Sequence, residues 1–297
     1  MPQLARTFAL QLMYNFARDF YANPQGQNHE VMSICCITKT MSGWNSQETV
    51  ALCRERCGGM GYLSHSRFGE YLAHAHSACT AEGDNRVLMS KICKDMIVNV
   101  RAKKQKVPEP VQSVAALGAL TDVTTINTLI DLLRFREKML FMKLTTKIAV
   151  LTKQKMTKFN ILFRHTSNEM QELAMAYGER HTIEACVRNI ARLKNAANAE
   201  TLTVISRLFA TECVRRELGF YLINKVVSPE AAKNTNKVRG ELINYMHANI
   251  NELIPCLNIP GHAIYAPIAA DWEEYYSRPN YGEVTNANGE VLAGAKL

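Results

Sequence analysis

The sequence lacks the features that would indicate a membrane protein or a β-sheet protein. Its 297 residues contain no run of about 18 apolar residues, the length that a membrane-spanning helix needs, so we expect no membrane span. No two alternating segments are joined by hairpin residues such as Asn-Gly between β-branched stretches. Apolar residues instead recur at helical spacing, and hydrophobic residues make up 47% of the chain. The sequence therefore predicts an all-α fold with a sizeable core.

Secretory and metal-binding signals are also missing. No signal-like apolar region follows Met1, and the nine cysteines are an odd number in a chain too long to need disulfides, so we expect free thiols in a reducing compartment. Cys53 and Cys57 have the spacing of two ligands on one helical face, but no second Cys or His pair follows at zinc spacing. His74 and His76 are two residues apart and point to different sides of a helix. We predict no metal site.

The positive charge of the chain is not arranged as a nucleic-acid surface. The net charge is +8, and its densest cluster is followed by two prolines, which predicts a solvated linker over residues 101–113. Attraction for a ligand with several phosphates is the alternative. Because no basic face studded with aromatic residues is present, we expect no nucleic-acid partner. The cluster consists of Arg101, Lys103, Lys104 and Lys106, before Pro108 and Pro110.

This linker divides the chain into two expected helical domains, residues 1–100 and 114–297. Asn45 followed by Glu48 resembles a capping box, Asp84 or Asn85 can cap another helix, and Ser228 before Pro229 predicts a helix start. The apolar stripe from Ile126 to Leu151 is typical of a long core helix. Helices are expected over residues 2–21, 30–39, 45–56, from 85 towards 100, 126–151, 157–178, 181–197, 200–225 and 229–254.

Two motifs occur in order between Cys53 and Met89. CRERCGGMGY is a glycine-rich segment after a helix, and AEGDN places Glu82 between small residues before the next helix. Together they resemble the signature of acyl-CoA oxidases, flavin enzymes related to acyl-CoA dehydrogenases, in which a C-R-x-x-C-G-G-x-G-Y loop precedes an E-G-D/E-N element. PQLARTFAL resembles a bundle helix of that family, and LAMAYGER, RRELGFYL and APIAADWEEYYSRPNYGEV resemble its C-terminal helical domain.

The resemblance identifies Glu82 as the catalytic base. Such a carboxylate removes the α-proton of a fatty acyl thioester while a hydride leaves the β-carbon for the flavin, and partial desolvation raises the pKa of a carboxyl in that role. Ala81 and Gly83 leave room for the acyl chain. On the residues alone, the alternative is that Glu82 is a first-turn carboxylate of the following helix.

By the same resemblance, Gly58, Gly59 and Gly61 approach the FAD of a partner subunit, which implies a dimer. Glycine suits this role because a backbone without Cβ atoms can come close to a cofactor. The alternative is a helix C-cap followed by a turn. No strand or ribose-binding acid accompanies these glycines, so they are not a Rossmann fingerprint. The family often has His at the position of Met60 and an aromatic residue at that of Ala81, so flavin-edge packing and acyl-chain preference stay open.

The resemblance implies the carboxyl-terminal half of an acyl-CoA oxidase, without the N-terminal helical domain and β-barrel of the family. The expected activity is FAD-dependent dehydrogenation of fatty acyl-CoA to trans-2-enoyl-CoA in fatty acid β-oxidation, with oxygen as acceptor and hydrogen peroxide as product. The expected partner is a second copy or a complementing N-terminal half, and we expect no turnover by the chain alone. The alternatives are a dehydrogenase with another acceptor and a non-catalytic assembly or scaffold subunit.

The sequence ends in a tripeptide that resembles a peroxisomal address. Ala295-Lys296-Leu297 differs from Ser-Lys-Leu only by Ala for Ser, after a polar, Gly-containing segment that a receptor could reach. We therefore expect recognition by the peroxisomal import receptor and a location in the peroxisome matrix.

Overall fold

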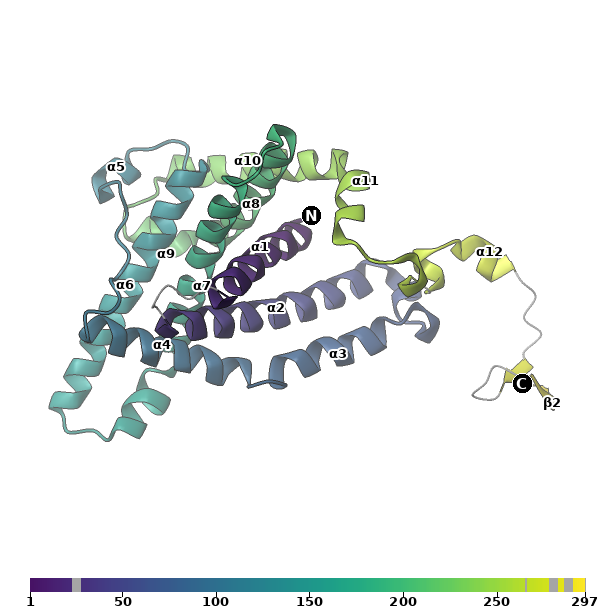
Figure 1. The fold of residues 1–297 in the computed structure, drawn as a ribbon, viewed down its shortest axis with the longest axis horizontal. Helices are drawn as coiled ribbons and strands as arrows, with labels where there is room; N and C mark the ends of the chain where they lie inside the picture. The colour runs from purple at the N-terminus through teal and green to yellow at the C-terminus, as the bar shows by residue number, and fades with distance from the viewer. Residues whose placement is uncertain (23–27, 265, 278–282, 286–290, 297) are drawn as a thin grey trace.

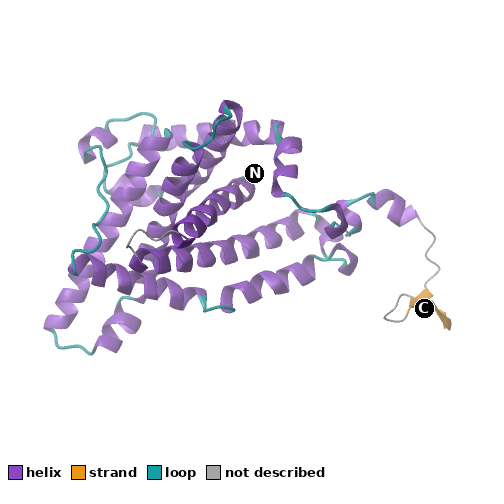
Figure 2. Cartoon of the chain, in the orientation of Figure 1, coloured by secondary structure: helices purple, strands orange, loops and turns teal. Residues whose placement is uncertain are grey.

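The computed structural model describes residues 1–22, 28–264, 266–277, 283–285 and 291–296, and helices form almost all of it (Figures 1 and 2). The α-helices are α1 (Pro2–Ala22), α2 (Asn28–Arg56), α3 (Phe68–Thr80), α4 (Asn85–Arg101), α5 (Val114–Gly118), α6 (Ile126–Lys153), α7 (Ser167–Ile190), α8 (Ala196–Arg216), α9 (Leu218–Ile223), α10 (Pro229–Ala248), α11 (Ile250–Leu253) and α12 (Trp272–Ser277). The shorter turns are η1 (Gly58–Gly61), η2 (Ser64–Ser66), the π-helical η3 (Asn160–His165), η4 (Pro255–Leu257), η5 (Gly261–Ala263) and η6 (Pro267–Ala269).

The all-α prediction is confirmed for the body of the molecule. A short hairpin of strands β1 (Glu283–Thr285) and β2 (Val291–Lys296), paired antiparallel, lies beyond α12 and away from the helical body (Figure 1). The sequence analysis did not expect these strands. The Asn288-Gly289 dipeptide between them lies outside the described residues.

The core runs from α1, α2 and α4 into α6, α7 and α8 without interruption. α7 is its centre, since it packs against α1, α2, α4, α6 and α8. At Gly178 on α7 a Cβ atom would overlap Ile37 and would lie 2.5 Å from Met41 Sδ, both of them on α2. This glycine therefore allows α7 and α2 to cross in close contact.

Two predicted helix breaks are wrong for a related reason. The expected helices over 30–39 and 45–56 are the single helix α2, and the expected break between 178 and 181 lies inside α7. Gly43 and Gly178 do not interrupt their helices. A Cβ atom at Gly43 would lie 3.2 Å from Ala78 O on α3, so this glycine serves packing as Gly178 does. Asn45, expected as a cap, is buried inside α2 and donates through Nδ2 to Thr7 Oγ1 on α1 at 3.0 Å.

Other helix ends follow the sequence. Ser228 caps α10, in which Pro229 is the first residue, and its Oγ accepts from Ala231 N at 3.1 Å. The expected helix over 229–254 is divided into α10 and α11, and the one over 200–225 into α8 and α9. The helix expected to begin at residue 157 begins as the π-helical η3, with α7 starting only at Ser167.

The predicted linker is attached to the core rather than freely solvated. The backbone N–H groups of Val111 and Gln112 donate to the buried carboxylate of Asp131 on α6, at 2.9 and 3.0 Å. The division into domains at residues 101–113 stays a prediction, while the buried core extends across it.

Candidate functional site

The glycine loop is a tight turn at the end of α2. Gly58 has φ +56°, the left-handed conformation that glycine adopts without steric cost just after a helix. A Cβ atom at Gly61 would overlap Arg54 O, so Gly61 lets η1 fold back onto α2. Gly58 and Gly59 are exposed, and a Cβ atom at either would meet nothing within 4 Å. The turn is therefore packed on one side at Gly61 and open at Gly58 and Gly59.

Glu82 lies in the turn between α3 and α4, just outside both helices. Its φ is +57° and that of Gly83 is +102°, so two consecutive residues have left-handed backbones. For a residue with a Cβ atom this conformation costs roughly 1–2 kcal/mol. The Glu82 side chain is exposed, and within the described residues it has no hydrogen-bond or ion-pair partner.

The capping function that was the alternative for Glu82 belongs to Asp84. The Asp84 carboxylate accepts from Arg86 N at 2.9 Å and from Val87 N at 3.1 Å at the start of α4. Glu82 precedes this N-cap and lies outside the first helical turn. A helix-capping role therefore does not explain its position.

The Glu82 turn, residues 81–84, is hydrogen-bonded to α2. Lys39 Nζ donates to Gly83 O at 2.6 Å and to Asn85 Oδ1 at 2.8 Å. Asn85 is only 2% exposed, and its Nδ2 donates to Thr40 O at 3.3 Å. The backbone at Glu82 is thus held by bonds to two adjacent residues of the longest helix in the described structure.

The structure does not bring Glu82 and the glycine loop together within one chain. They lie at opposite ends of α3, whose 13 residues span about 20 Å. The predicted catalytic and cofactor-binding residues are therefore about 20 Å apart within one chain.

A groove of about 890 Å³ lies between α1 and α2, next to the Glu82 turn. Its lining includes Lys39, so the groove and the turn share that residue. Two lining atoms, Asn45 Oδ1 and Thr49 Oγ1, are buried without a hydrogen-bond partner. These residues are four apart on α2 and share one face. On α1, Tyr14 and Tyr21 line the groove and are 52% and 71% exposed. The groove is thus an apolar surface with unsatisfied polar atoms.

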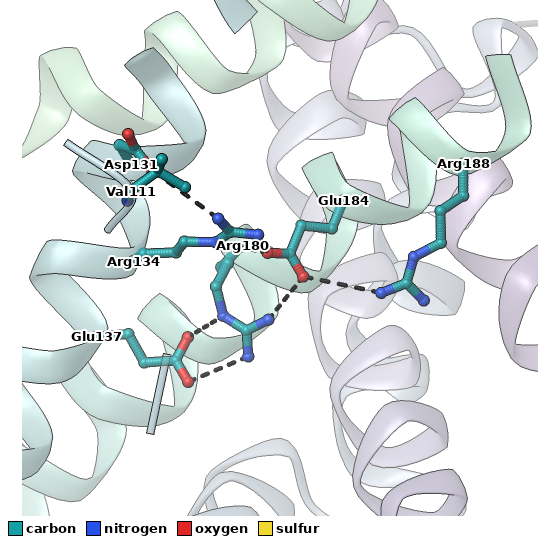
Figure 3. Close-up of polar contacts among 7 residues, drawn as sticks. All are labelled: Val111, Asp131, Arg134, Glu137, Arg180, Glu184 and Arg188. Carbon is teal, nitrogen blue, oxygen red and sulfur yellow. Dashed lines mark hydrogen bonds and ion pairs between the residues drawn. The ribbon is translucent and has the colours of Figure 1, made fainter. Parts of the chain in front are cut away.

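Charged residues are buried between α6 and α7 (Figure 3). Arg180 donates to both oxygens of Glu137 and to Glu184 Oε2, and Arg134 donates to Glu184 Oε1. Glu137 is fully buried and Arg180 is 7% exposed. Burial lowers the pKa of Arg180, but the Glu137 and Glu184 carboxylates together raise it by more, so the guanidinium stays charged. The sequence carries no local signal for this cluster, because residues 134–137 and 180–184 are far apart in the chain.

The basic cluster of the linker faces mixed charge. Lys104 and Lys106 line a cavity of about 510 Å³ that Glu30, Glu109 and Glu184 also line. Such a surface does not favour a polyanion over other ligands.

The remaining candidate ligands are dispersed. All nine cysteines are free thiols, and the described residues contain no group of three or more His, Cys, Asp or Glu side chains placed to hold a metal ion. His74 and His76 are exposed on α3. None of the described helices combines the length and apolar character needed to cross a membrane.

Two family models match the chain. The acyl-CoA oxidase C-alpha1 domain matches residues 1–97, and the acyl-CoA oxidase model matches residues 125–271. An acyl-coenzyme A oxidase-like protein of Mus musculus is 23% identical, over 90% of this chain and 45% of its own length. The peroxisomal acyl-coenzyme A oxidase 2 of Arabidopsis thaliana is 23% identical, over 93% of this chain and 43% of its own.

Solved structures show the same fold. Acyl-CoA oxidase 1 of Yarrowia lipolytica superposes with a TM-score of 0.78 and 20% identity, over 94% of this chain and 47% of that one. Acyl-CoA oxidase-1 of Caenorhabditis elegans, complexed with FAD and ATP, has a TM-score of 0.79 and 17% identity, over 93% of this chain and 44% of that one. The chain thus spans less than half the length of these relatives, and the likeness at such identity concerns the fold alone.

Proposed function

The chain belongs to the acyl-CoA oxidase family, of which it carries the C-terminal helical domains, and we propose that it is the carboxyl-terminal half of an acyl-CoA oxidase. In this proposal it dehydrogenates fatty acyl-CoA to trans-2-enoyl-CoA when an N-terminal half completes the site. The observation that carries the proposal is Glu82, an exposed carboxylate on a turn that Lys39 of α2 holds through a hydrogen bond to Gly83 O.

Glu82 has one chemical step to perform. Its carboxylate takes the α-proton of the acyl thioester as the C2–C3 double bond forms and the β-carbon loses a hydride, so the carboxylate leaves the step protonated. FAD, when bound, supplies the hydride acceptor and, on reoxidation by oxygen, the source of hydrogen peroxide. The strained turn keeps the carboxylate outside both helices, where a substrate can reach it.

The glycine turn suits the edge of a flavin site. At Gly58 and Gly59 the backbone is exposed and no atom occupies the space that a Cβ would fill, so a cofactor can approach the main chain. Glu82 lies about 20 Å away along α3. In this proposal, the glycine turn and the Glu82 side chain of one chain therefore contribute to two different active sites. This arrangement requires a dimer of completed subunits.

The groove between α1 and α2 is the surface on which the complementing half docks in this proposal. The chain spans less than half the length of these relatives, and in this proposal the part of an oxidase that it does not match contacts it at this groove. A helix with an apolar face would cover Tyr14 and Tyr21, which line this groove. Ser46→Trp fills this groove and should abolish association, whereas Lys233→Trp, on the exposed side of α10, should not.

The decisive experiment is reconstitution. The chain is co-purified with the N-terminal half of a related oxidase, flavin absorbance is recorded, and peroxide is assayed with acyl-CoA. Glu82→Gln should abolish peroxide formation and retain the flavin, while Glu230→Gln, which removes an exposed charge on α10, should retain both. Peroxide formation by the Glu82→Gln complex would disprove the assignment of the base.

The same experiment separates the alternatives. A non-catalytic assembly subunit, which the half-length coverage favours, would associate with its partner without binding flavin. A dehydrogenase would bind flavin and reduce an artificial acceptor without releasing peroxide. Only an oxidase gives flavin and peroxide together.

We also propose a peroxisomal location. Two of the Arabidopsis thaliana relatives that match most of the chain are named as peroxisomal. Leu297 of the Ala295-Lys296-Leu297 tripeptide lies outside the described residues. Imaging of a fluorescent fusion with and without the tripeptide tests the proposal, because loss of peroxisomal signal is expected on its removal.

A further inference from the structure

Lys39 occupies an unusual place between the groove and the Glu82 turn. It is a half-buried residue of α2, and it lines the groove. Its ammonium group donates hydrogen bonds to the turn between α3 and α4 and to the first residue of α4, at Gly83 O (2.6 Å) and Asn85 Oδ1 (2.8 Å). Two of the three donors of this ammonium are thus engaged by the turn that carries Glu82.

The turn needs an anchor at this point. Its first residue, Ala81, is hydrogen-bonded to the end of α3 through Ala81 N and Ser77 O at 2.8 Å, and its last, Asp84, caps α4. Between these two ends Glu82 and Gly83 both have positive φ. The Gly83 carbonyl accepts a charge-assisted hydrogen bond from Lys39, which is stronger than a bond from a neutral donor.

The second acceptor extends the anchor into the core. Asn85 is buried, and it accepts from Lys39 through Oδ1 while its Nδ2 donates to Thr40 O. Adjacent residues of α2 therefore hold both polar atoms of one side chain at the start of α4. The position of the turn relative to α2 is fixed in two places.

We propose that Lys39 is a positioning residue that holds the Glu82 carboxylate where the substrate α-proton is removed. The proposal rests on the proposed function. Lys39 acts through the Gly83 carbonyl and Asn85, and it does not touch the reacting atoms. Because Lys39 lines the groove, a helix docked there shields the two hydrogen bonds from water, so association with the N-terminal half strengthens the hold on Glu82.

Kinetics of the reconstituted complex test the positioning role. Lys39→Met should lower kcat on the order of tenfold to a hundredfold, as expected for a base displaced by about 1 Å, with KM nearly unchanged. Lys39→Arg should recover most of the loss, because a guanidinium can donate to the same two acceptors. The matched control is Lys91→Met, which removes an exposed ion pair with Asp95 on α4 and should not alter kcat.

Hydrogen exchange of the full chain without its partner tests the anchor independently of activity. Amide exchange over residues 81–86 should accelerate in Lys39→Met and not in Lys91→Met. Unchanged exchange would overturn the inference, and so would faster exchange combined with wild-type kcat in a folded complex. If the wild-type complex forms no peroxide, the proposed function fails, and exchange alone then supports or refutes the anchor.

Discussion

Arg180 on α7 donates through Nε and Nη2 to the two carboxylate oxygens of Glu137 on α6, at 2.5 and 3.2 Å. Neither side chain has appreciable contact with water. A pair of this kind joins two consecutive α-helices, and the charge of either partner is tolerated only in the presence of the other. The stability of the α6–α7 interface therefore depends on both residues together.

Arg180→Met should destabilise the chain by about 3–5 kcal/mol, because Glu137 would remain buried without a partner. The free energy of unfolding in urea measures the loss. Lys91→Met, which breaks the exposed ion pair with Asp95, should cost at most about 1 kcal/mol. Equal losses in the two variants would show that burial of the Arg180 pair has no energetic consequence.

The chain should lose stability as the pH falls below about 6.5. Burial, with the positive charges of Arg180 and Arg188, lowers the pKa of His181 well below its usual value. The unfolded chain then binds a proton that the folded chain rejects, so this contribution is complete above the unfolded pKa and is lost at lower pH, by up to about 1.4 kcal/mol per pH unit.

Urea unfolding of His181→Phe at pH 7.5 and 5.5 checks this assignment. His181 Nε2 has no hydrogen-bond partner, so phenylalanine removes the titration without breaking a bond at that atom. The variant should show a smaller difference between the two pH values than the wild type. His74→Gln, at an exposed position of α3, should keep the wild-type difference.

Asp131→Ala should release the segment between α4 and α5. The N–H groups of Val111 and Gln112 lose their acceptor, and the basic cluster over residues 101–106 becomes a better trypsin substrate. Limited proteolysis followed by mass spectrometry should detect faster cleavage there. Asp19→Ala, at an exposed position of α1, serves as the control, and equal cleavage rates would mean that Asp131 does not restrain the segment.

Two glycines of the loop should respond differently to alanine. Gly61→Ala forces a Cβ atom against Arg54 O and should destabilise the isolated chain, whereas Gly59→Ala meets no atom within 4 Å and should not. If the loop approaches the flavin as proposed, Gly59→Ala should instead weaken flavin retention in the reconstituted complex. Thermal melting and flavin absorbance measure the two effects separately, and normal flavin retention by Gly59→Ala would argue against a cofactor at this turn.

The sequence predicted best what depends on local pattern. The apolar stripe from Ile126 to Leu151 marks α6, and the cap at Ser228 marks the start of α10. The predicted breaks near Gly43 and Gly178 were wrong, and both glycines allow close packing inside continuous helices. Only the neighbouring helix reveals this packing.

The same limit applies to the candidate site. The position of Glu82 between small residues was visible in the sequence, and its role as catalytic base stays a proposal. The bond from Lys39 to Gly83 joins residues 44 apart in sequence, so no spacing rule indicates it. Nor did local pattern indicate that α3 separates Glu82 from the glycine loop of the same chain.

The crossing at Gly178 has a consequence for synthesis on the ribosome. Ile37 and Met41 contact α7 at Gly178, so they lack this contact in the nascent polypeptide until residue 178 has been translated and has left the exit tunnel. During that interval α2 exposes apolar side chains that α7 contacts in the folded chain, and exposed apolar surface of this kind is prone to aggregation. If translation stalls after α4 and before α7, the apolar side chains of α2 that face α7 therefore stay exposed on the nascent chain.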